Sequence, residues 1–288
     1  MKNFQKANRS NCTMKLSIQG PSGSGKTLGA LHIAHGLIGN LNKVAVIDTE
    51  NGSSHLYANI GDFSVLSMQA PYSPEMFIQA LDLAISSGYQ CVIIDSLSHE
   101  WFGSGGILDI HSNMEGNSFT NWSKLTPRHN ALIQKIVDAP IHVIATLRSK
   151  TEYVIQQKNG KSIPEKVGMK AVQRDDSEYE FTIAFELNKY HMASISKDRT
   201  GLFNLEPELI LTERVGHMIR DWCMVDKNQQ RQDVVDRMMQ CQDLYQLEQM
   251  IHEHPQLADQ YREEISALTE ELLLRNQLKF KQNGTTTR

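Results

Sequence analysis

The segment from Gly20 to Thr27 carries the residue types that hold a nucleoside triphosphate. It reads Gly-Pro-Ser-Gly-Ser-Gly-Lys-Thr, the complete G-x-x-x-x-G-K-[ST] pattern. Its glycines let backbone N–H groups surround phosphate oxygens, its lysine reaches the β- and γ-phosphates, and its hydroxyl ligates Mg²⁺. We therefore expect ATP and Mg²⁺ as cofactors, with Lys26 also catalytic. The expected ATP-binding residues are Gly20, Pro21, Ser22, Gly23, Ser24, Gly25, Lys26 and Thr27.

An acidic residue ends the apolar run Val92–Asp95, downstream of this loop. In phosphate-loop proteins, a carboxylate at the end of a buried strand beside the loop holds Mg²⁺ through water or the loop hydroxyl. We therefore predict a metal site formed by Thr27 and Asp95.

A second acidic segment, Ile47–Glu50, follows the first helix after the loop. ATP hydrolysis needs a carboxylate that orients and polarises the attacking water. We interpret Glu50 as this catalytic base and Asp48 as a supporting residue. Glu100, which follows the Asp95 strand, is the alternative base.

Thr146 ends the next buried strand. A polar side chain at this position can contact the γ-phosphate and relay its loss to the following segment, so we include Thr146 among the ATP-binding residues. The alternative is a β-branched residue of the core.

Two cations flank one residue in Lys197-Asp198-Arg199-Thr200-Gly201. In ring or filament ATPases, such cations enter the neighbouring subunit's site and neutralise charge on the γ-phosphate. We predict that Lys197 and Arg199 are catalytic in this way, within a homo-oligomer that is a ring or a filament. A solvated turn is the alternative.

Residues 148–174 are rich in lysine and arginine and contain an Asn-Gly turn flanked by lysines. A basic hairpin suits contacts to the backbone of single-stranded DNA, and a solvated surface arm is the alternative. The candidate DNA-binding residues are Arg148, Lys150, Lys158, Lys161, Lys166, Lys170 and Arg174.

A second segment that could touch DNA is Gly103–Lys124, interpreted as a long Gly/Ser/Asn loop. Phe102, Phe119 and Trp122 lie near or within it. Aromatic side chains on a mobile loop can stack on bases, although they can equally pack beneath the loop.

Short apolar runs alternate with helical patterns along the first two thirds of the chain. This order predicts an α/β fold with a parallel sheet covered by helices on both faces. Two later runs, 178–188 and 191–196, predict an antiparallel hairpin at the sheet edge. The other expected strands cover 14–19, 43–48, 63–68, 90–95 and 141–147, and the expected helices cover 26–37, 74–87 and 125–138.

The character of the sequence changes near Pro207. Residues 231–278 are rich in Gln, Glu, Leu and Met at helical spacing and predict two or three helices. We therefore expect an N-terminal segment at 1–13, an ATPase core at 14–206, a helical C-terminal module at 207–280 and a disordered tail at 281–288.

The composition places few further limits on function. The net charge of −4 gives no global attraction to nucleic acid or acidic membranes, so any basic surface must be local. The four cysteines form no C-x-x-C pair, and no long apolar run or apolar leader is present. We therefore expect a soluble protein with no membrane partner, in the cytoplasm of a bacterial or phage-infected cell.

The order of four motifs resembles the RecA superfamily: Gly20–Thr27, then IDTE at 47–50, VIIDS at 92–96 and KDRTG at 197–201. The sequence is most similar to phage-borne nucleotide-binding proteins, the RecA-like single-strand-annealing ATPases. The resemblance covers about residues 10–205 and implies a RecA-like core that supports DNA recombination by annealing, with ATP binding and a preference for single strands. It does not cover the C-terminal module.

Three functions follow from these residues. The leading hypothesis is a DNA-stimulated ATPase that acts on single-stranded DNA as an oligomer. The second is an ATP-dependent loader or accessory ATPase that regulates a replication protein through the C-terminal helices. A small-molecule kinase is disfavoured, because the Lys197–Gly201 segment has no use in a monomeric kinase.

Overall fold

A mainly parallel β-sheet carries the segments singled out above. The computed structural model describes residues 8–9, 12–158, 161–174, 180–206 and 208–283. The predicted N-terminal segment and the last residues of the predicted tail lie largely outside this part. The strands are β1 Lys15–Gly20, β2 Val44–Asp48, β3 Ser64–Ser67, β4 Cys91–Asp95, β5 His142–Lys158, β6 Lys161–Ala171, β7 Ile183–Leu187, β8 Met192–Asp198 and β9 Leu209–Ile210.

The helices alternate with the strands in the first part of the chain and follow one another in the last. They are α1 Lys26–Ile38, α2 Pro74–Ser86, α3 Ser98–Phe102, α4 Ile107–Ser112, α5 Ser118–Asp138, α6 Glu213–Met239, α7 Leu244–Glu253, α8 Pro255–Gln260 and α9 Arg262–Asn283. Two 3₁₀ segments, η2 Leu41–Lys43 and η3 Ser53–Ile60, flank β2.

The strand order is β3-β2-β4-β5-β1-β7-β8-β9, and β6 pairs only with β5. Neighbouring strands from β3 to β7 are parallel, whereas β7–β8 and β8–β9 are antiparallel. The predicted α/β fold and its antiparallel hairpin are therefore confirmed. The short strand β9 adds one further neighbour beyond the hairpin.

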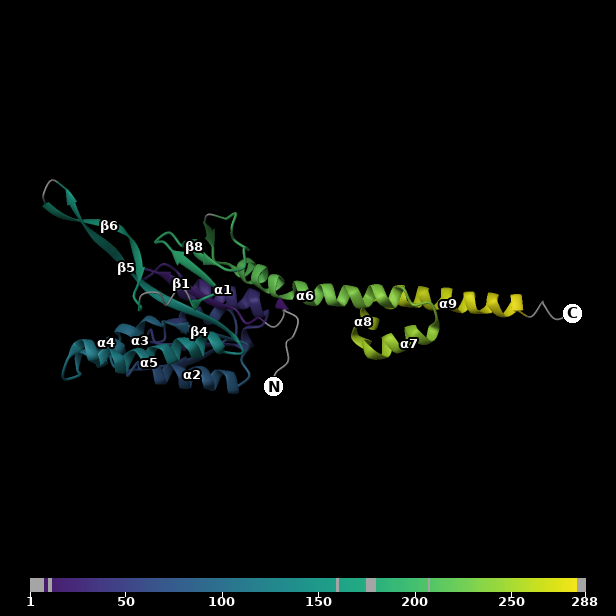
Figure 1. Cartoon of the computed structure of the whole chain (residues 1–288), viewed down its shortest axis with the longest axis horizontal. Helices are drawn as coiled ribbons and strands as arrows, with labels where there is room; N and C mark the ends of the chain where they lie inside the picture. Colours follow the sequence, from purple (N-terminus) through teal and green to yellow (C-terminus); the bar gives the residue numbers. More distant parts are fainter. Residues whose placement is uncertain (1–7, 10–11, 159–160, 175–179, 207, 284–288) are drawn as a thin grey trace. The chain divides into compact units, whose positions relative to one another are not determined.

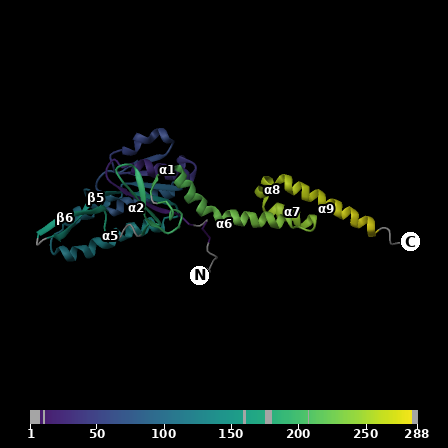
Figure 2. The ribbon, with the colours of Figure 1, turned by 90° about the horizontal axis from the view of Figure 1, so that it is seen from above.

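Helices cover both faces of the sheet because its central strands are apolar on both sides. Phe77 and Leu81 of α2 and Leu132 of α5 pack with inward residues of β2, β4 and β5, such as Ile94. Figure 1 shows α2 and α5 together on one side of the strands. Figure 2 shows α1 on the side away from α5, where its residue Leu31 is fully buried.

The helices α1 and α6 touch through their backbones at a pair of glycines. A Cβ at Gly36 would lie 2.0 Å from the carbonyl oxygen of Glu213, and a Cβ at Gly216 would lie 2.2 Å from that of Ile33. No side chain fits between backbones at these distances, so glycine is required at both positions.

The chain separates into two compact units, one of residues 11–222 and one of residues 1–10 with 223–288. The second unit has its own apolar cluster, which includes Met238, Leu247, Ile265 and Leu272. The division falls later than the predicted boundary at 206 because α6 begins against α1 and ends in the second unit. Residues 281–283 of the predicted disordered tail belong to α9, which continues to Asn283, and the remainder lies outside the described residues.

The interpretation of Gly103–Lys124 as a long loop is wrong. This segment contains α4 and the first turns of α5, which begins where the Asn117 side chain accepts a 2.8 Å hydrogen bond from the backbone N–H of Phe119. The pattern predicted α5 only from residue 125 onward, because few residues of 103–124 are apolar.

No helix in the described part of the chain is both long and apolar enough to span a bilayer.

Candidate active site

The ends of four neighbouring parallel strands bring the predicted site residues to one edge of the sheet. The register sets Asp48 opposite Asp95 and Gly20 opposite Arg148. The phosphate loop starts at Gly20, where β1 ends. This is the edge where ligands bind in open α/β sheets, because helix N-termini and loops gather there.

The phosphate loop has the backbone form that an anion cradle requires. Gly23 and Gly25 have φ angles of 76° and 90°, which side-chain-bearing residues rarely adopt. The Lys26 ammonium donates to the carbonyl oxygens of Gly20 at 3.0 Å and Pro21 at 2.9 Å. Burial lowers the pKa of this ammonium, and the nearby carboxylates of Asp95 and Glu50 oppose that change.

The Ser24 side chain of the phosphate loop also suits a bound triphosphate. The buried Ser24 hydroxyl oxygen has no hydrogen-bond partner among the described residues. The loop therefore combines a positive-φ backbone, a partly buried ammonium and an unpaired hydroxyl, which suit bound phosphate oxygens.

Asp95 is held by two hydroxyl groups. Thr27 donates to one of its carboxylate oxygens at 2.6 Å, and Thr146 donates to the other at 2.5 Å. Burial raises the pKa of Asp95 above its usual range, and the two hydroxyl hydrogen bonds oppose that rise. The geometry joins Thr27 and Asp95 as predicted for a metal site. Thr146, predicted to contact the γ-phosphate, is fully buried and directed at Asp95 instead.

Glu50 lies in the loop after β2 and is paired with Arg148. The guanidinium donates to both oxygens of the Glu50 carboxylate, from Nε at 2.8 Å and from Nη2. Burial raises the pKa of Glu50, but the hydrogen bond and charge of Arg148 outweigh it, so the pKa lies below its usual value.

Asp48 shapes the loop that presents Glu50. Its buried carboxylate accepts from the backbone N–H groups of Glu50 at 2.7 Å, Gly52 at 3.2 Å and Ser54 at 2.9 Å. Three such bonds fix the start of the loop, which agrees with the supporting position expected for Asp48.

Glu100, the alternative base, lies in a buried polar cluster on the α5 side. Its carboxylate contacts Nδ1 of His129 at 3.0 Å and accepts from the side-chain amide of Gln173 at 3.3 Å. Glu100 is fully buried, whereas the Glu50 side chain is 21% exposed.

Arg199 lies at the opposite end of the sheet from the phosphate loop. Its backbone N–H donates to Thr182, whose own N–H donates to Lys15 at the start of β1. The loop begins five residues along β1, about 16 Å away at the usual strand rise, so the backbone of Arg199 is remote from the phosphate loop of its own chain. Lys197 is nearer, because it pairs with Ala184, which is opposite Ser17 of β1.

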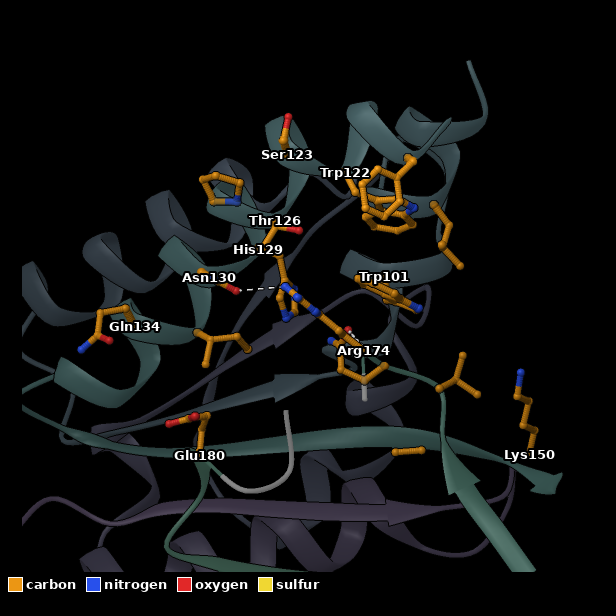
Figure 3. A pocket seen from close by; sticks show the side chains of 17 residues that line it. Trp101, Trp122, Ser123, Thr126, His129, Asn130, Gln134, Lys150, Arg174 and Glu180 are labelled. Atoms are coloured by element: carbon orange, nitrogen blue, oxygen red, sulfur yellow. Dashed lines mark hydrogen bonds between the residues drawn. The ribbon is translucent and has the colours of Figure 1, made fainter. Parts of the chain in front are cut away.

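A groove of about 1250 Å³ lies beside this site, lined mainly by α5, by α3 and by the residues that follow β6. Trp101 and Trp122 stack with ring centroids 5.8 Å apart, and Phe119 is 86% exposed. Figure 3 shows both tryptophans on one side of the groove and Arg174 extending toward Asn130, to which it donates at 3.1 Å. Lys150 also lines the groove, and Glu180 adds a carboxylate.

The predicted basic hairpin is formed by β5 and β6, and the first part of β5 is also a strand of the central sheet. Strand β5 pairs with β1 and β4 up to Arg148 and then continues with β6 alone as an antiparallel arm. Lys158, Lys161, Lys166 and Lys170 are in this arm, while the turn residues 159 and 160 lie outside the described part. Arg148 differs from the other predicted DNA-binding residues because it belongs to the Glu50 site.

Three features of the site were missed from the sequence. The pairing of Arg148 with Glu50 left no local signal, because 98 residues separate them. Trp101 directly precedes Phe102 but was not among the aromatic residues predicted to contact bases. His191, in the turn between β7 and β8, places Nδ1 3.0 Å from the carbonyl oxygen of Ser24.

A phosphate loop joined by Thr27 to an acidic strand end defines a P-loop nucleotide-binding protein. The family model described as an AAA domain matches residues 13–200, well over half of the chain. The chain therefore belongs to this AAA-domain family of P-loop ATPases, which bind and hydrolyse ATP and typically use Mg²⁺. None of the curated proteins compared with the chain matches it.

Proposed function

We propose that this ATPase acts on single-stranded DNA, as an oligomer, in recombination by annealing. The proposal is supported by the aromatic and basic groove beside the phosphate site, and by the resemblance of the four motifs to RecA-like single-strand-annealing ATPases. The groove is the observation that carries it.

The groove offers the two kinds of contact that a sequence-indifferent binder of single strands uses. Phe119, which is 86% exposed, provides a flat apolar face on which a base can stack, and Lys150 and Arg174 provide cations for phosphates. Trp122 is stacked between Trp101 and His111, so the two tryptophans form the apolar wall beside this face. Base stacking contributes roughly 1–3 kcal/mol per base and tolerates every base. A pocket for a small metabolite is usually enclosed and mainly apolar. This groove instead combines an exposed aromatic ring with cations.

The arm extends this basic surface. Its register sets Lys150 opposite Lys170 and Lys158 opposite Lys161. Lysines at paired positions concentrate positive charge along the arm, and a phosphate backbone is a polyanion that such charge attracts. An arm with lysines at two such rungs is therefore suited to a polyanion.

The residues of the phosphate site take the following roles in this proposal. Lys26 and the loop N–H groups bind the β- and γ-phosphates, and Thr27 with Asp95 holds Mg²⁺, which neutralises phosphate charge when bound. Glu50 orients the attacking water and accepts its proton. Glu100 is not suited to this role, because it is enclosed with His129 and Gln173.

The position of Arg199 supports an oligomer. Because its backbone lies about 16 Å along the sheet from its own phosphate loop, we assign Lys197 and Arg199 to a neighbour's site. Such a head-to-tail contact is heterologous and produces a ring or a filament.

The test is binding of the full chain to a fluorescein-labelled oligo-dT over a range of salt concentrations. We expect Phe119→Ala to weaken binding about tenfold, the scale of one lost stacked base. Lys150→Glu should weaken binding and also reduce the salt slope, because fewer counterions are released. Tyr245→Ala and Lys43→Glu, which change exposed residues elsewhere, are matched controls.

Unchanged affinity in both groove variants would place the nucleic acid elsewhere, and no binding by the unaltered chain would reject this function. The second candidate, an accessory ATPase that regulates a protein partner, is favoured by exposed Tyr245 and Leu274 in the C-terminal unit. Stimulation of ATP hydrolysis by oligo-dT supports the first function, and its absence supports the second.

A further inference from the structure

Arg148 occupies both oxygens of the Glu50 carboxylate. This bidentate pair is the strongest form of charge-assisted hydrogen bond available to a side chain. A carboxylate neutralised in this way is a weak base and has little freedom to turn toward a water molecule. In the described structure Glu50 is thus held in a form that does not suit the role proposed for it.

Arg148 also lies between the base and the phosphate loop. Its backbone is opposite Gly20, the first loop residue, and its charge lowers the pKa of Lys26. Its backbone N–H donates to the Ser98 hydroxyl at 2.9 Å, and its guanidinium lies 5.6 Å from the centroid of the Phe102 ring.

Arg148 also lies where the basic arm, the β5–β6 hairpin, begins. Arg148 is the last β5 residue that pairs with β1 before the strand continues with β6 alone. Its carbonyl oxygen accepts a 2.6 Å hydrogen bond from Val172, where the chain returns from the arm. Lys150 and Arg174, both in the groove, follow Arg148 and Val172 by two residues each.

We propose that the Arg148–Glu50 pair is a lock that restrains ATP hydrolysis until nucleic acid engages the groove and the arm. Movement of Lys150 or Arg174 toward a bound phosphate backbone displaces Arg148 and frees the Glu50 carboxylate. The part of this inference that names nucleic acid rests on the proposed function, whereas the restraint of Glu50 does not.

The strength of the lock sets the size of the expected effect. A hydrogen bond between charged groups favours the paired form by about tenfold or more, which leaves roughly one molecule in ten or fewer with a free Glu50. Removing the lock should therefore raise the basal rate of hydrolysis about tenfold.

The first experiment measures ATP hydrolysis by full-length Arg148→Gln without DNA and with saturating oligo-dT. We expect a basal rate about tenfold above that of the unaltered chain, and little further stimulation by DNA. Arg128→Gln is the matched control, because Arg128 forms the same bidentate pair with Glu75 but lies away from the phosphate loop. This control should keep both the low basal rate and the stimulation.

The second readout is the pH dependence of the basal rate. The charged and titratable groups around Glu50 are Arg148, His99, Lys26, Asp95 and Asp48. Without Arg148, the Glu50 carboxyl loses its main source of a lowered pKa, so the acid limb of the rate profile should move to higher pH. A loss of folding alone would lower the rate without moving this limb.

Arg148→Lys keeps a charge but makes only a single contact, so it should give an intermediate basal rate even if the Gln variant is unstable. A basal rate below that of the unaltered chain in both variants, with oligo-dT still bound, would overturn the lock and make Arg148 a cation that assists hydrolysis. If the unaltered chain is not stimulated by DNA but Arg148→Gln still raises the basal rate, the proposed function fails and the restraint of Glu50 stands.

Discussion

Thr27 donates to Asp95 across an intervening strand, over 2.6 Å. Strand β5 lies between β1, which leads into the phosphate loop, and β4, which ends at Asp95. Thr146 of β5 donates to the other oxygen of the same carboxylate. The first turn of α1 and the strands β4 and β5 are thus joined at the point where Mg²⁺ would bind.

Asp95→Asn should abolish Mg²⁺-dependent hydrolysis while leaving the fold intact. An amide keeps one acceptor oxygen, so it can retain only one of the two hydroxyl hydrogen bonds, and it lacks the charge that a divalent cation requires. Hydrolysis and binding of a fluorescent ATP analogue should be measured with and without Mg²⁺. Asp82→Asn, at a surface ion pair with Lys135, serves as the control. Normal Mg²⁺-dependent turnover by Asp95→Asn would contradict the metal assignment.

Glu50→Gln should bind ATP normally and hydrolyse it at least about a hundredfold more slowly, the scale of a lost general base. Glu100→Gln should instead mainly affect stability, because it replaces a buried carboxylate that contacts His129. Single-turnover hydrolysis and thermal unfolding of both variants separate the two roles. The base assignment is wrong if Glu100→Gln alone shows slow hydrolysis with an unchanged melting temperature.

Arg199→Ala should keep ATP binding and lose hydrolysis, because Arg199 is too far from its own phosphate loop to act there. Mixing this variant with Glu50→Gln should restore part of the activity, since some interfaces then combine an intact Glu50 with an intact Arg199. Hydrolysis by the mixture, with light scattering to verify co-assembly, measures this rescue. Co-assembly without rescue would show that Arg199 does not act across the interface.

His142 makes stability depend on pH. Burial, followed by the charge of Lys15, lowers its pKa from 6.5 to about 4, and its Nδ1 accepts from the backbone N–H of Met14 at 3.0 Å. Between these pH values the unfolded chain binds a proton that the folded chain does not, so stability falls as pH falls from about 6.5 to about 4. The loss should be roughly 2–3 kcal/mol over this range.

His142→Asn keeps an acceptor near Nδ1 but does not titrate, so it should remove most of this dependence. Urea unfolding at several pH values from 4 to 7 measures the change, with His55→Asn, at an exposed histidine, as the control. If the free energy of unfolding falls equally with pH in His142→Asn and in the unaltered chain, groups other than His142 cause the acid sensitivity.

The phosphate loop and Asp95 were predictable because their chemistry is local. A glycine-rich turn between a strand and a helix, and an apolar run that ends in Asp, indicate their own structure without knowledge of the rest of the fold. The hairpin of β7 and β8 was predictable for the same reason, since two apolar runs flank a short turn.

The environment of each carboxylate was not predictable in this way. Glu50 and Glu100 both follow apolar strands, yet one lies near the loop and the other is enclosed by His129 and Gln173. The difference depends on strand order, which places β5 and its Arg148 next to β1. The groove was likewise hidden, because α4 and the first turns of α5 carry too few apolar residues for their helical period to be visible.

The glycine contact between α1 and α6 has a mechanical consequence. With Gly36 and Gly216 at the crossing, no layer of side chains separates the two backbones, so one helix cannot roll or slide over the other without a steric clash. The first turns of α6 are therefore stiffly coupled to α1, whose first residue is Lys26. A shift of the first turn of α6 would therefore be passed on to α1 and to the phosphate-loop residues at its start.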